Sequence, residues 1–254
     1  MPCVQCQSNS KFINNFHNIN DPAKLKSSLY KCLKCNLYFF DRKNHVSDIY
    51  KKNQLSTTMI KPRHILLSRL IQKICHKGNL LEIGSGDSHI FNMLNNDNYQ
   101  FSAIDYYQSL NLPMKTKFFK GGIDDCPDNF FNQNQFDIII MDNLIEHLVD
   151  PQKTIKKISQ WLSNDGYICI AIPNRWNIKN LLTLQLNYEF RYPSEHLNIY
   201  TRKSIHYLFN SNHYELSKQY YLPYNAFSFF NMLSLLGYPL FGIYFFYKKK
   251  LFIN

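Results

Sequence analysis

Two pairs of cysteines near the start of the chain have the spacing of a tetrahedral metal site. Cys3 and Cys6 form one Cys-x-x-Cys pair, and Cys32 and Cys35 form the second. Each pair can grip a Zn²⁺ ion from a tight turn, and four thiolates close the coordination sphere of the ion. The spacing therefore predicts a structural zinc ion rather than a catalytic one.

Residues 1–45 are expected to fold as a small module around this ion. They offer little other apolar material for a core, so the metal would supply the folding energy. The chain begins without an apolar leader-like run, which favours a reducing compartment and argues against disulfides. The remaining cysteines stand alone in the sequence, and we expect them to be small buried hydrophobes: Cys75, Cys126 and Cys169.

A glycine-rich turn, LLEIGSGDS, follows later in the chain. Gly84 and Gly86 come directly after an apolar run, where the absence of a side chain lets the backbone curl under a ligand. A dinucleotide fingerprint requires a third glycine where this chain has His89. The carboxylate of Glu82 would repel a pyrophosphate but attract the sulfonium and ammonium groups of S-adenosylmethionine. The turn therefore favours S-adenosylmethionine as the cofactor.

Strands and helices are predicted to alternate through residues 79–221, after a connecting helix within residues 46–78. This alternation is typical of a parallel sheet with helices on both faces and a ligand crevice at the carboxyl ends of the strands. Asp105 closes the second strand, where an acid can bind the ribose hydroxyls of either cofactor. The predicted strands are LLEI, QFSAID, KFFK, FDIIIM, YICIAI and YELSKQYYL; the predicted helices are HILLSRLIQKI, SHIFNMLNN, DPQKTIKKISQWL, which SNDGY ends with a turn, and TRKSIHYLFN.

With these motifs in place, residues 79–221 resemble a class I S-adenosylmethionine-dependent methyltransferase of the large bacterial methyltransferase-domain group. The motifs that carry the resemblance are LLEIGSGDS, AIDYY, GGIDDCP, FDIIIMDNLIEHLVDP, LSNDGYICIAIPN and EHLNIYTRKSI. The front of the chain resembles the zinc-ribbon-like module of family members that act on sugars and on glycan or lipid precursors. The resemblance implies an α/β fold: a Rossmann-like methyltransferase sheet with a small N-terminal zinc-binding module. A hydrophobic C-terminal extension lies outside the resemblance.

The resemblance also implies roles for particular residues. Glu82, Gly84 and Gly86 would line the methionine end of the cofactor, and Asp105 would bind its ribose. The loop GGIDDCP would edge the adenine, although family members usually have an acid directly after its first glycine. This chain has Gly122 at that position. Either Asp124 or Asp125 would take the place of the missing acid, or backbone amides alone would bind the adenine. Asp142 is a further candidate at the cofactor site. Ser88 stands in place of a common third glycine and is expected to cap the following helix.

Methyl transfer to a hydroxyl group benefits from a general base, and histidine suits that role near neutral pH. His147 follows the fourth predicted strand, and His196 follows the fifth strand after the insertion PNRWNIKNLLTLQLNYEFRYP. We expect one of these histidines to deprotonate the acceptor and the insertion to form a lid or acceptor wall. Asp142 and Glu146 are the alternatives for the base or for a clamp on the acceptor.

The net charge of +11 is concentrated at the two ends of the chain. Residues 1–63 carry +8, residues 64–221 carry none, and the last 33 residues carry +3. Residues 222–254 form an apolar and aromatic tail that ends in a lysine cluster, Lys248 to Lys250. Its Gly and Pro residues argue against a spanning helix, so the sequence favours contact with a membrane surface, with a core strand or dimer face as the plain alternative.

The sequence as a whole favours a methyltransferase that modifies a sugar, glycan or lipid-linked acceptor. We expect oxygen to be the methylated atom. We expect it to be cytoplasmic, with possible peripheral contact at the inner face of the membrane. An RNA base methyltransferase is the alternative that the basic front supports, although nucleic acid is the less favoured partner. A non-catalytic scaffold with a degenerate methyltransferase domain is the other alternative. The sequence predicts no oligomeric state.

Overall fold

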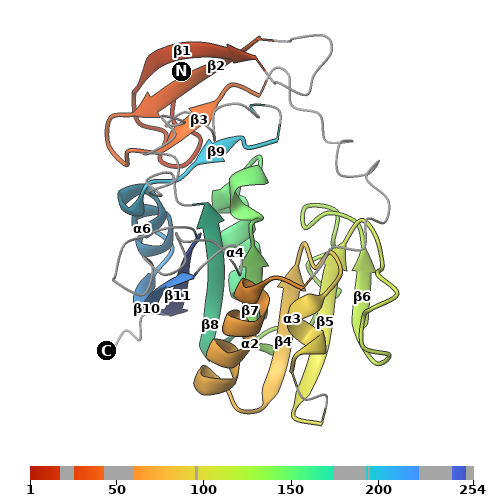
Figure 1. The fold of residues 1–254 in the computed structure, drawn as a ribbon. Helices are drawn as coiled ribbons and strands as arrows, with labels where there is room; N and C mark the ends of the chain where they lie inside the picture. Colours follow the sequence, from red (N-terminus) through yellow and green to blue (C-terminus); the bar gives the residue numbers. More distant parts are fainter. Residues whose placement is uncertain are drawn as a thin grey trace, which may run out of the picture.

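The computed structural model describes residues 1–17, 26–42, 60–94, 97–173, 193, 195–222 and 242–249. Figure 1 shows a large twisted sheet with helices on both faces and a small sheet above its carboxyl-end edge. The helices are α2 (Pro62–Ile74), α3 (His89–Asn92), the 3₁₀ helix η1 (Ile145–His147), α4 (Pro151–Trp161) and α6 (Arg202–Asn210). The strands are β1 (Ser10–His17), β2 (Lys26–Cys32), β3 (Tyr38–Phe40), β4 (Gly78–Ile83), β5 (Tyr99–Asp105), β6 (Lys117–Lys120), β7 (Phe136–Asp142), β8 (Leu162–Pro173), β9 (Asn198–Ile199), β10 (Tyr214–Leu222) and β11 (Gly242–Lys249).

The large sheet has the strand order β10-β11-β8-β7-β4-β5-β6. Five neighbouring strands, from β8 to β6, run parallel to one another, and β11 runs antiparallel to both β8 and β10. The order reverses at β4, so the crevice at the carboxyl ends of β4 and β7 is where such a sheet binds its ligand. The predicted α/β fold is confirmed.

Side chains of the central strands alternate between two apolar layers. In β7, Ile138 and Ile140 pack with α2 and α3 on one face, whereas Ile139 and Met141 pack with α4 and α6 on the other. All four side chains are fully buried. A strand that is covered on both faces reads as a continuous apolar run, which is why FDIIIM could be recognised in the sequence.

The predicted helices form, with two differences. The sequence predicted a helix over residues 88–96, but α3 spans only His89–Asn92, and the end of α4 also differs. Asp150 caps this helix by accepting a hydrogen bond from the Lys153 amide at 2.9 Å, and Pro151 occupies its first turn. The expected turn in SNDGY is wrong, because β8 begins at Leu162, directly after Trp161. The register of β8 against β7 shifts between Phe136 and Ile138, which takes up the extra residues of that stretch.

The N-terminal module is a sheet in the order β1-β2-β3-β9, and its last strand comes from far along the chain. Tyr38 pairs with Ile199 and Phe39 with Asn198, so residues after β8 complete the module. Residues 1–45 contain more buried apolar material than expected, but they share it with later parts of the chain: Leu29 and Phe40 cluster with Ile199, and Leu37 and Phe39 with the main sheet. The module buries several apolar side chains completely: Leu29, Leu37, Phe39 and Phe40.

Arg42 links the N-terminal module to the large sheet through hydrogen bonds. Its guanidinium donates hydrogen bonds to the carbonyl of Leu197 at 3.1 Å and to the side-chain oxygen of Asn198 at 2.9 Å. The Asn198 amide in turn donates to the carbonyl of Leu148, beside η1. Leu37 and Phe39 also share one apolar cluster with the main sheet. The module and the main sheet are therefore packed as one unit along this edge.

The C-terminal segment corrects the expected boundary after residue 221. Residues 242–249, assigned by sequence to an apolar tail, form β11 in the interior of the large sheet. Phe245, Phe246 and Tyr247 are fully buried there, and Lys248 forms an ion pair with Asp165 at 2.9 Å. The plain alternative, a strand that completes the fold, is the one observed for these residues. Within the described ranges, no helix is long and apolar enough to cross a bilayer.

Three predicted features lie outside the described residues. They are the stretch 43–59 at the start of the connecting region, most of the predicted acceptor-side insertion at 174–192, and the apolar stretch 223–241.

Candidate cofactor and metal sites

The turn after β4 has the open backbone that the glycines predicted. Gly84 and Gly86 are exposed and have φ angles of +73° and +49°, in the left-handed region that glycine favours. A Cβ atom on Gly86 would meet no atom within 4 Å, so the space above it is open. Ser88 also has a positive φ of 53°, and its side chain makes no capping hydrogen bond. The expected capping role of Ser88 is wrong, and its backbone is in the left-handed region that glycine favours.

Hydrogen bonds tie this turn to the end of β5. The amide of Gly84 donates to the carbonyl of Ile104 at 2.8 Å, and the amide of Gly86 donates to Oδ2 of Asp105 at 2.8 Å. The other oxygen of Asp105 accepts a hydrogen bond from the Tyr107 amide at 3.2 Å. Each carboxylate oxygen keeps a further lone pair. Asp105 can therefore orient the glycine turn and still accept two hydroxyl groups.

Glu82 is buried at the carboxyl end of β4 and is only 3% exposed. Burial raises the pKa of its carboxyl group well above the usual value, and the nearby carboxylates of Asp142 and Asp105 raise it further. Its Oε2 atom accepts no hydrogen bond from the described residues. A buried carboxylate of this kind is costly to ionise unless a cation is bound beside it. The site therefore fits a ligand that carries a positive charge, as S-adenosylmethionine does.

Asp142 ends β7 and pairs with a residue that the sequence analysis missed. Nη2 of Arg63, in the first turn of α2, lies 3.5 Å from Oδ2 of Asp142, and both side chains are largely buried. Arg63 was missed because α2 and β7 meet only in the folded chain. The pair brings a guanidinium group to the carboxyl ends of the strands, beside the acids of the cofactor site.

The loop after β6 explains the glycine that departs from the family pattern. A Cβ atom on Gly122 would lie 2.5 Å from the hydroxyl of Tyr106 and 3.1 Å from Oδ2 of Asp125, so a side chain there would require these groups to move. The carboxylate of Asp125 accepts a hydrogen bond from the Gly122 amide at 3.0 Å. Asp124 is exposed and lies 3.7 Å from Nζ of Lys153 on α4. Asp125 is thus engaged within the loop itself, and Asp124 pairs with α4; the assignment of either acid to the adenine stays a prediction.

His196 lies beside Glu146 and His147, although about 50 residues separate it from this adjacent pair in the sequence. Nε2 of His147 lies 3.9 Å from Oε1 of Glu146, and the rings of His147 and His196 lie 4.9 Å apart in a T-shaped contact. Nδ1 of His147 hydrogen-bonds the carbonyl of Glu195 at 2.8 Å. Leu144, directly before η1, packs on Gly84. The three residues therefore lie on the same edge of the sheet as the cofactor turn.

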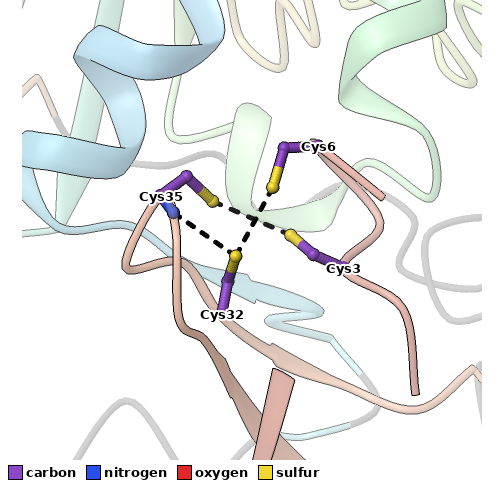
Figure 2. Close-up of side chains that lie close together, drawn as sticks. All are labelled: Cys3, Cys6, Cys32 and Cys35. Carbon is purple, nitrogen blue, oxygen red and sulfur yellow. Dashed lines mark hydrogen bonds between the residues drawn. The ribbon is translucent and has the colours of Figure 1, made fainter. Parts of the chain in front are cut away.

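The four N-terminal cysteines converge as their spacing predicted (Figure 2). Sγ of Cys3 lies 3.7 Å from that of Cys35, and Sγ of Cys6 lies 3.4 Å from that of Cys32. Tetrahedral Zn²⁺ with Zn–S bonds of about 2.3 Å would place neighbouring sulfurs about 3.8 Å apart. The amide of Cys35 also donates to Sγ of Cys32 at 3.3 Å. The sulfurs are not bonded to one another, and their arrangement fits a four-thiolate zinc site.

Comparison with known proteins agrees with this geometry. A family model described as a methyltransferase domain matches residues 54–219. A search of curated proteins found no match.

Solved methyltransferase structures share the fold at low sequence identity. The Burkholderia thailandensis 1,6-didemethyltoxoflavin-N1-methyltransferase, solved with 1,6-didemethyltoxoflavin and S-adenosylhomocysteine, superposes with a TM-score of 0.54 at 11% identity, covering 75% of this chain and 80% of that one. The plantazolicin methyltransferase BpumL, with a substrate analogue and S-adenosylhomocysteine, gives 0.52 at 17% identity over 74% and 83%. A complex of the Haloferax volcanii Trm112 methyltransferase activator with a putative methyltransferase gives 0.57 at 12% identity over 76% and 92%.

The strand order, the glycine turn and the acids around it define a class I S-adenosylmethionine-dependent methyltransferase. The chain belongs to the methyltransferase-domain family whose model spans most of its length.

Proposed function

We propose that this enzyme methylates an oxygen atom of a sugar, glycan or lipid-linked acceptor. The observation that carries the proposal is the histidine pair on the cofactor edge, His147 and His196, with ring centroids 4.9 Å apart. A hydroxyl group has to lose its proton during methyl transfer, and a positioned imidazole can take it. The resemblance of the front of the chain to enzymes of sugars and of glycan or lipid precursors supports this class of acceptor.

The residues of the cofactor turn have separable tasks in this reaction. S-adenosylmethionine, when bound, supplies a methyl group on a positively charged sulfur. Glu82 would pair with the ammonium group of the cofactor, Arg63 would face its carboxylate, and Asp105 would accept its ribose hydroxyls. One of the two histidines would receive the acceptor's proton as the acceptor oxygen bonds to the methyl carbon and the carbon–sulfur bond breaks. Alignment and exclusion of water supply most of the acceleration in such a displacement.

The four-thiolate cluster would hold a structural zinc ion. Four sulfur ligands leave no open position for water or substrate, so this ion would support the module and take no part in methyl transfer. The module completes its sheet with β9, which directly follows His196, so the zinc would also hold the acceptor side of the site in place. Peripheral membrane contact stays a prediction, and residues 242–249 give it no support because they form β11.

An RNA base methyltransferase is a second candidate, supported by one observation. Lys11 and Phe12 on β1 and Lys26 on β2 are exposed, with Lys26 at the other end of the strand pair from Phe12. Exposed cations and an exposed aromatic ring on one sheet suit a single-stranded nucleic acid. Electrophoretic mobility shifts with short RNAs at several salt concentrations would test this candidate. Binding that Phe12→Ala abolishes at low salt would favour it over a glycan acceptor.

Transfer of a radiolabelled methyl group from S-adenosylmethionine to a panel of sugars, undecaprenyl-type lipid glycans and RNAs tests the proposed function. We expect the label to be transferred to an acceptor of the glycan class. Product analysis should identify the labelled group as a methyl ether. The histidine variants His147→Ala and His196→Ala should each lose turnover most strongly at low pH if the remaining base is water-derived hydroxide. Full turnover in both variants, with the pH profile of the wild type, would exclude a histidine base.

A further inference from the structure

We propose that Glu146, His147 and His196 form a second metal site, which binds one divalent transition-metal ion beside the cofactor turn. One ligand atom from each residue lies within 4.8 Å of the others, in the part of the chain that the structure describes. The existence of this site does not depend on the proposed function; only its role in acceptor activation rests on it.

The spacing of the first two ligands leaves room for an ion. Nε2 of His147 and Oε1 of Glu146 are 3.9 Å apart, whereas a direct charged hydrogen bond would bring them to about 2.7–2.9 Å. Bonds of about 2.1 Å from nitrogen and oxygen allow at most about 4.2 Å between two ligands of one metal ion. The pair is thus too far apart for a direct hydrogen bond and close enough to share an ion.

The hydrogen bond of the His147 ring has the pattern of a metal-bound histidine. Its Nδ1 lies 2.8 Å from the carbonyl of Glu195, and a carbonyl oxygen can only accept, so Nδ1 carries the proton. In the neutral ring the lone pair is then on Nε2, the nitrogen that faces Glu146. Metal-ligating histidines almost always donate their second ring nitrogen in this way, and the bond fixes both the tautomer and the ring orientation.

The ligand set indicates the class of ion. Two imidazoles and one carboxylate suit Zn²⁺, Co²⁺, Mn²⁺ or Fe²⁺, and three protein ligands leave coordination positions open. Glu146 is only 3% exposed, so the ion would sit at a shielded position where its charge acts strongly. An acceptor hydroxyl on an open position would lose its proton to solvent more readily, as metal-bound water does. With the ion bound, the activation of the hydroxyl that the proposed function assigns to a histidine base would pass to the ion, and the two histidines would hold the ion in place.

Cobalt binding to the zinc-containing full chain tests the proposal. Co²⁺ is added to protein whose zinc content is measured beforehand, and visible absorption reports the new site. Co²⁺ in the cysteine cluster would be recognised by intense thiolate charge-transfer absorption and by release of zinc. We expect one further Co²⁺ per chain, without thiolate absorption, and an affinity reduced at least about 10- to 100-fold in Glu146→Gln and in His196→Ala.

Matched controls and an independent readout keep the test decisive. His76→Ala and Glu215→Gln remove an exposed histidine and an exposed acid elsewhere, and both should bind Co²⁺ like the wild type. No Co²⁺ beyond the zinc stoichiometry, or equal binding in Glu146→Gln and His196→Ala, would overturn the proposal. Calorimetric binding of S-adenosylhomocysteine to the same samples reports the cofactor site separately. Cofactor binding without Co²⁺ binding would refute the metal site alone, and the reverse would refute the proposed function alone.

Discussion

The amide of Gly86 donates a hydrogen bond to the carboxylate of Asp105 at 2.8 Å, which joins the glycine turn after β4 to the end of β5. The two residues were assigned to different ends of the cofactor by sequence. Their contact means that the acid expected to bind ribose also sets the shape of the turn that lies under the methionine end.

Asp105→Ala should therefore weaken cofactor binding in two ways. It removes acceptors for the ribose hydroxyls, and it releases the amides of Gly86 and Tyr107. Because hydrogen bonds to charged groups are worth about 1.5–3 kcal/mol, we expect the affinity for S-adenosylhomocysteine to fall roughly 10- to 100-fold. Calorimetry measures this change, and an unaltered affinity would show that the ribose is held elsewhere.

Asp124→Asn should leave the affinity for S-adenosylhomocysteine unchanged. Asp124 is exposed and faces Lys153 on α4. Because an exposed ion pair contributes little to stability, its loss should not disturb the fold around the cofactor site. The variant is matched to Asp105→Ala as an acid in the neighbouring loop. A loss of affinity comparable to that of Asp105→Ala would instead support the assignment of Asp124 to the adenine.

Cys35→Ser should destabilise the whole protein, because the cysteine cluster belongs to the same apolar core as the main sheet. Cys3, Cys32 and Cys35 are fully buried within that core. We expect loss of zinc by elemental analysis and a single thermal transition at lower temperature, with a loss of at least about 3 kcal/mol. Cys75→Ser, outside the cluster, is the control. A separate early transition followed by an unchanged main one would mean that the module unfolds alone.

Arg42→Ala should loosen the contact between the N-terminal module and the main sheet. The guanidinium bonds to Leu197 and Asn198, which flank the start of β9, and burial lowers its pKa only to about 10, so it remains charged near neutral pH. Truncation leaves buried acceptors unpaired, and we expect about 2–4 kcal/mol of destabilisation. Arg42→Lys should restore little, because lysine lacks the planar fork. Chemical unfolding measures the change; a value near zero would contradict this role.

Glu82→Gln should stabilise the cofactor-free protein. The pKa of Glu82 is raised by burial and by Asp142 and Asp105, so the folded state holds a proton that the unfolded chain releases above its ordinary pKa near 4.5. Stability of the wild type should therefore fall as pH rises through that value and level off above the raised pKa. The neutral amide avoids this loss, and the variant should melt higher than the wild type at alkaline pH. An equal decline of both proteins with pH would contradict the assignment.

The strands that carry the cofactor site could be predicted because they are buried on both faces. β4, β5 and β7 read as apolar runs that carry Glu82, Asp105 and Asp142 at their last residue or next to it, so each strand and its acid were visible together. The cysteine cluster could also be predicted, because two Cys-x-x-Cys pairs have the spacing that is typical of a four-thiolate metal site.

The features that sequence could not place depend on contacts between distant segments. β11 reads as an apolar, aromatic tail, and only its pairing with β8 and β10 shows that it is a core strand. The pairing of β3 with β9 brings the N-terminal module beside His196. Arg63 reaches Asp142 through the packing of α2 against the sheet. No periodicity in the chain encodes these contacts.

Calorimetric binding of S-adenosylhomocysteine to the wild type and to Glu82→Gln, at neutral pH and about two pH units lower, tests the central claim most directly. The ammonium of the ligand requires the ionised carboxylate, so affinity in the wild type should drop up to about tenfold for each pH unit below the raised pKa of Glu82. Glu82→Gln should bind weakly at both pH values, while Glu215→Gln should behave like the wild type. Tight, pH-independent binding to Glu82→Gln would contradict the assignment of Glu82 to a cationic cofactor.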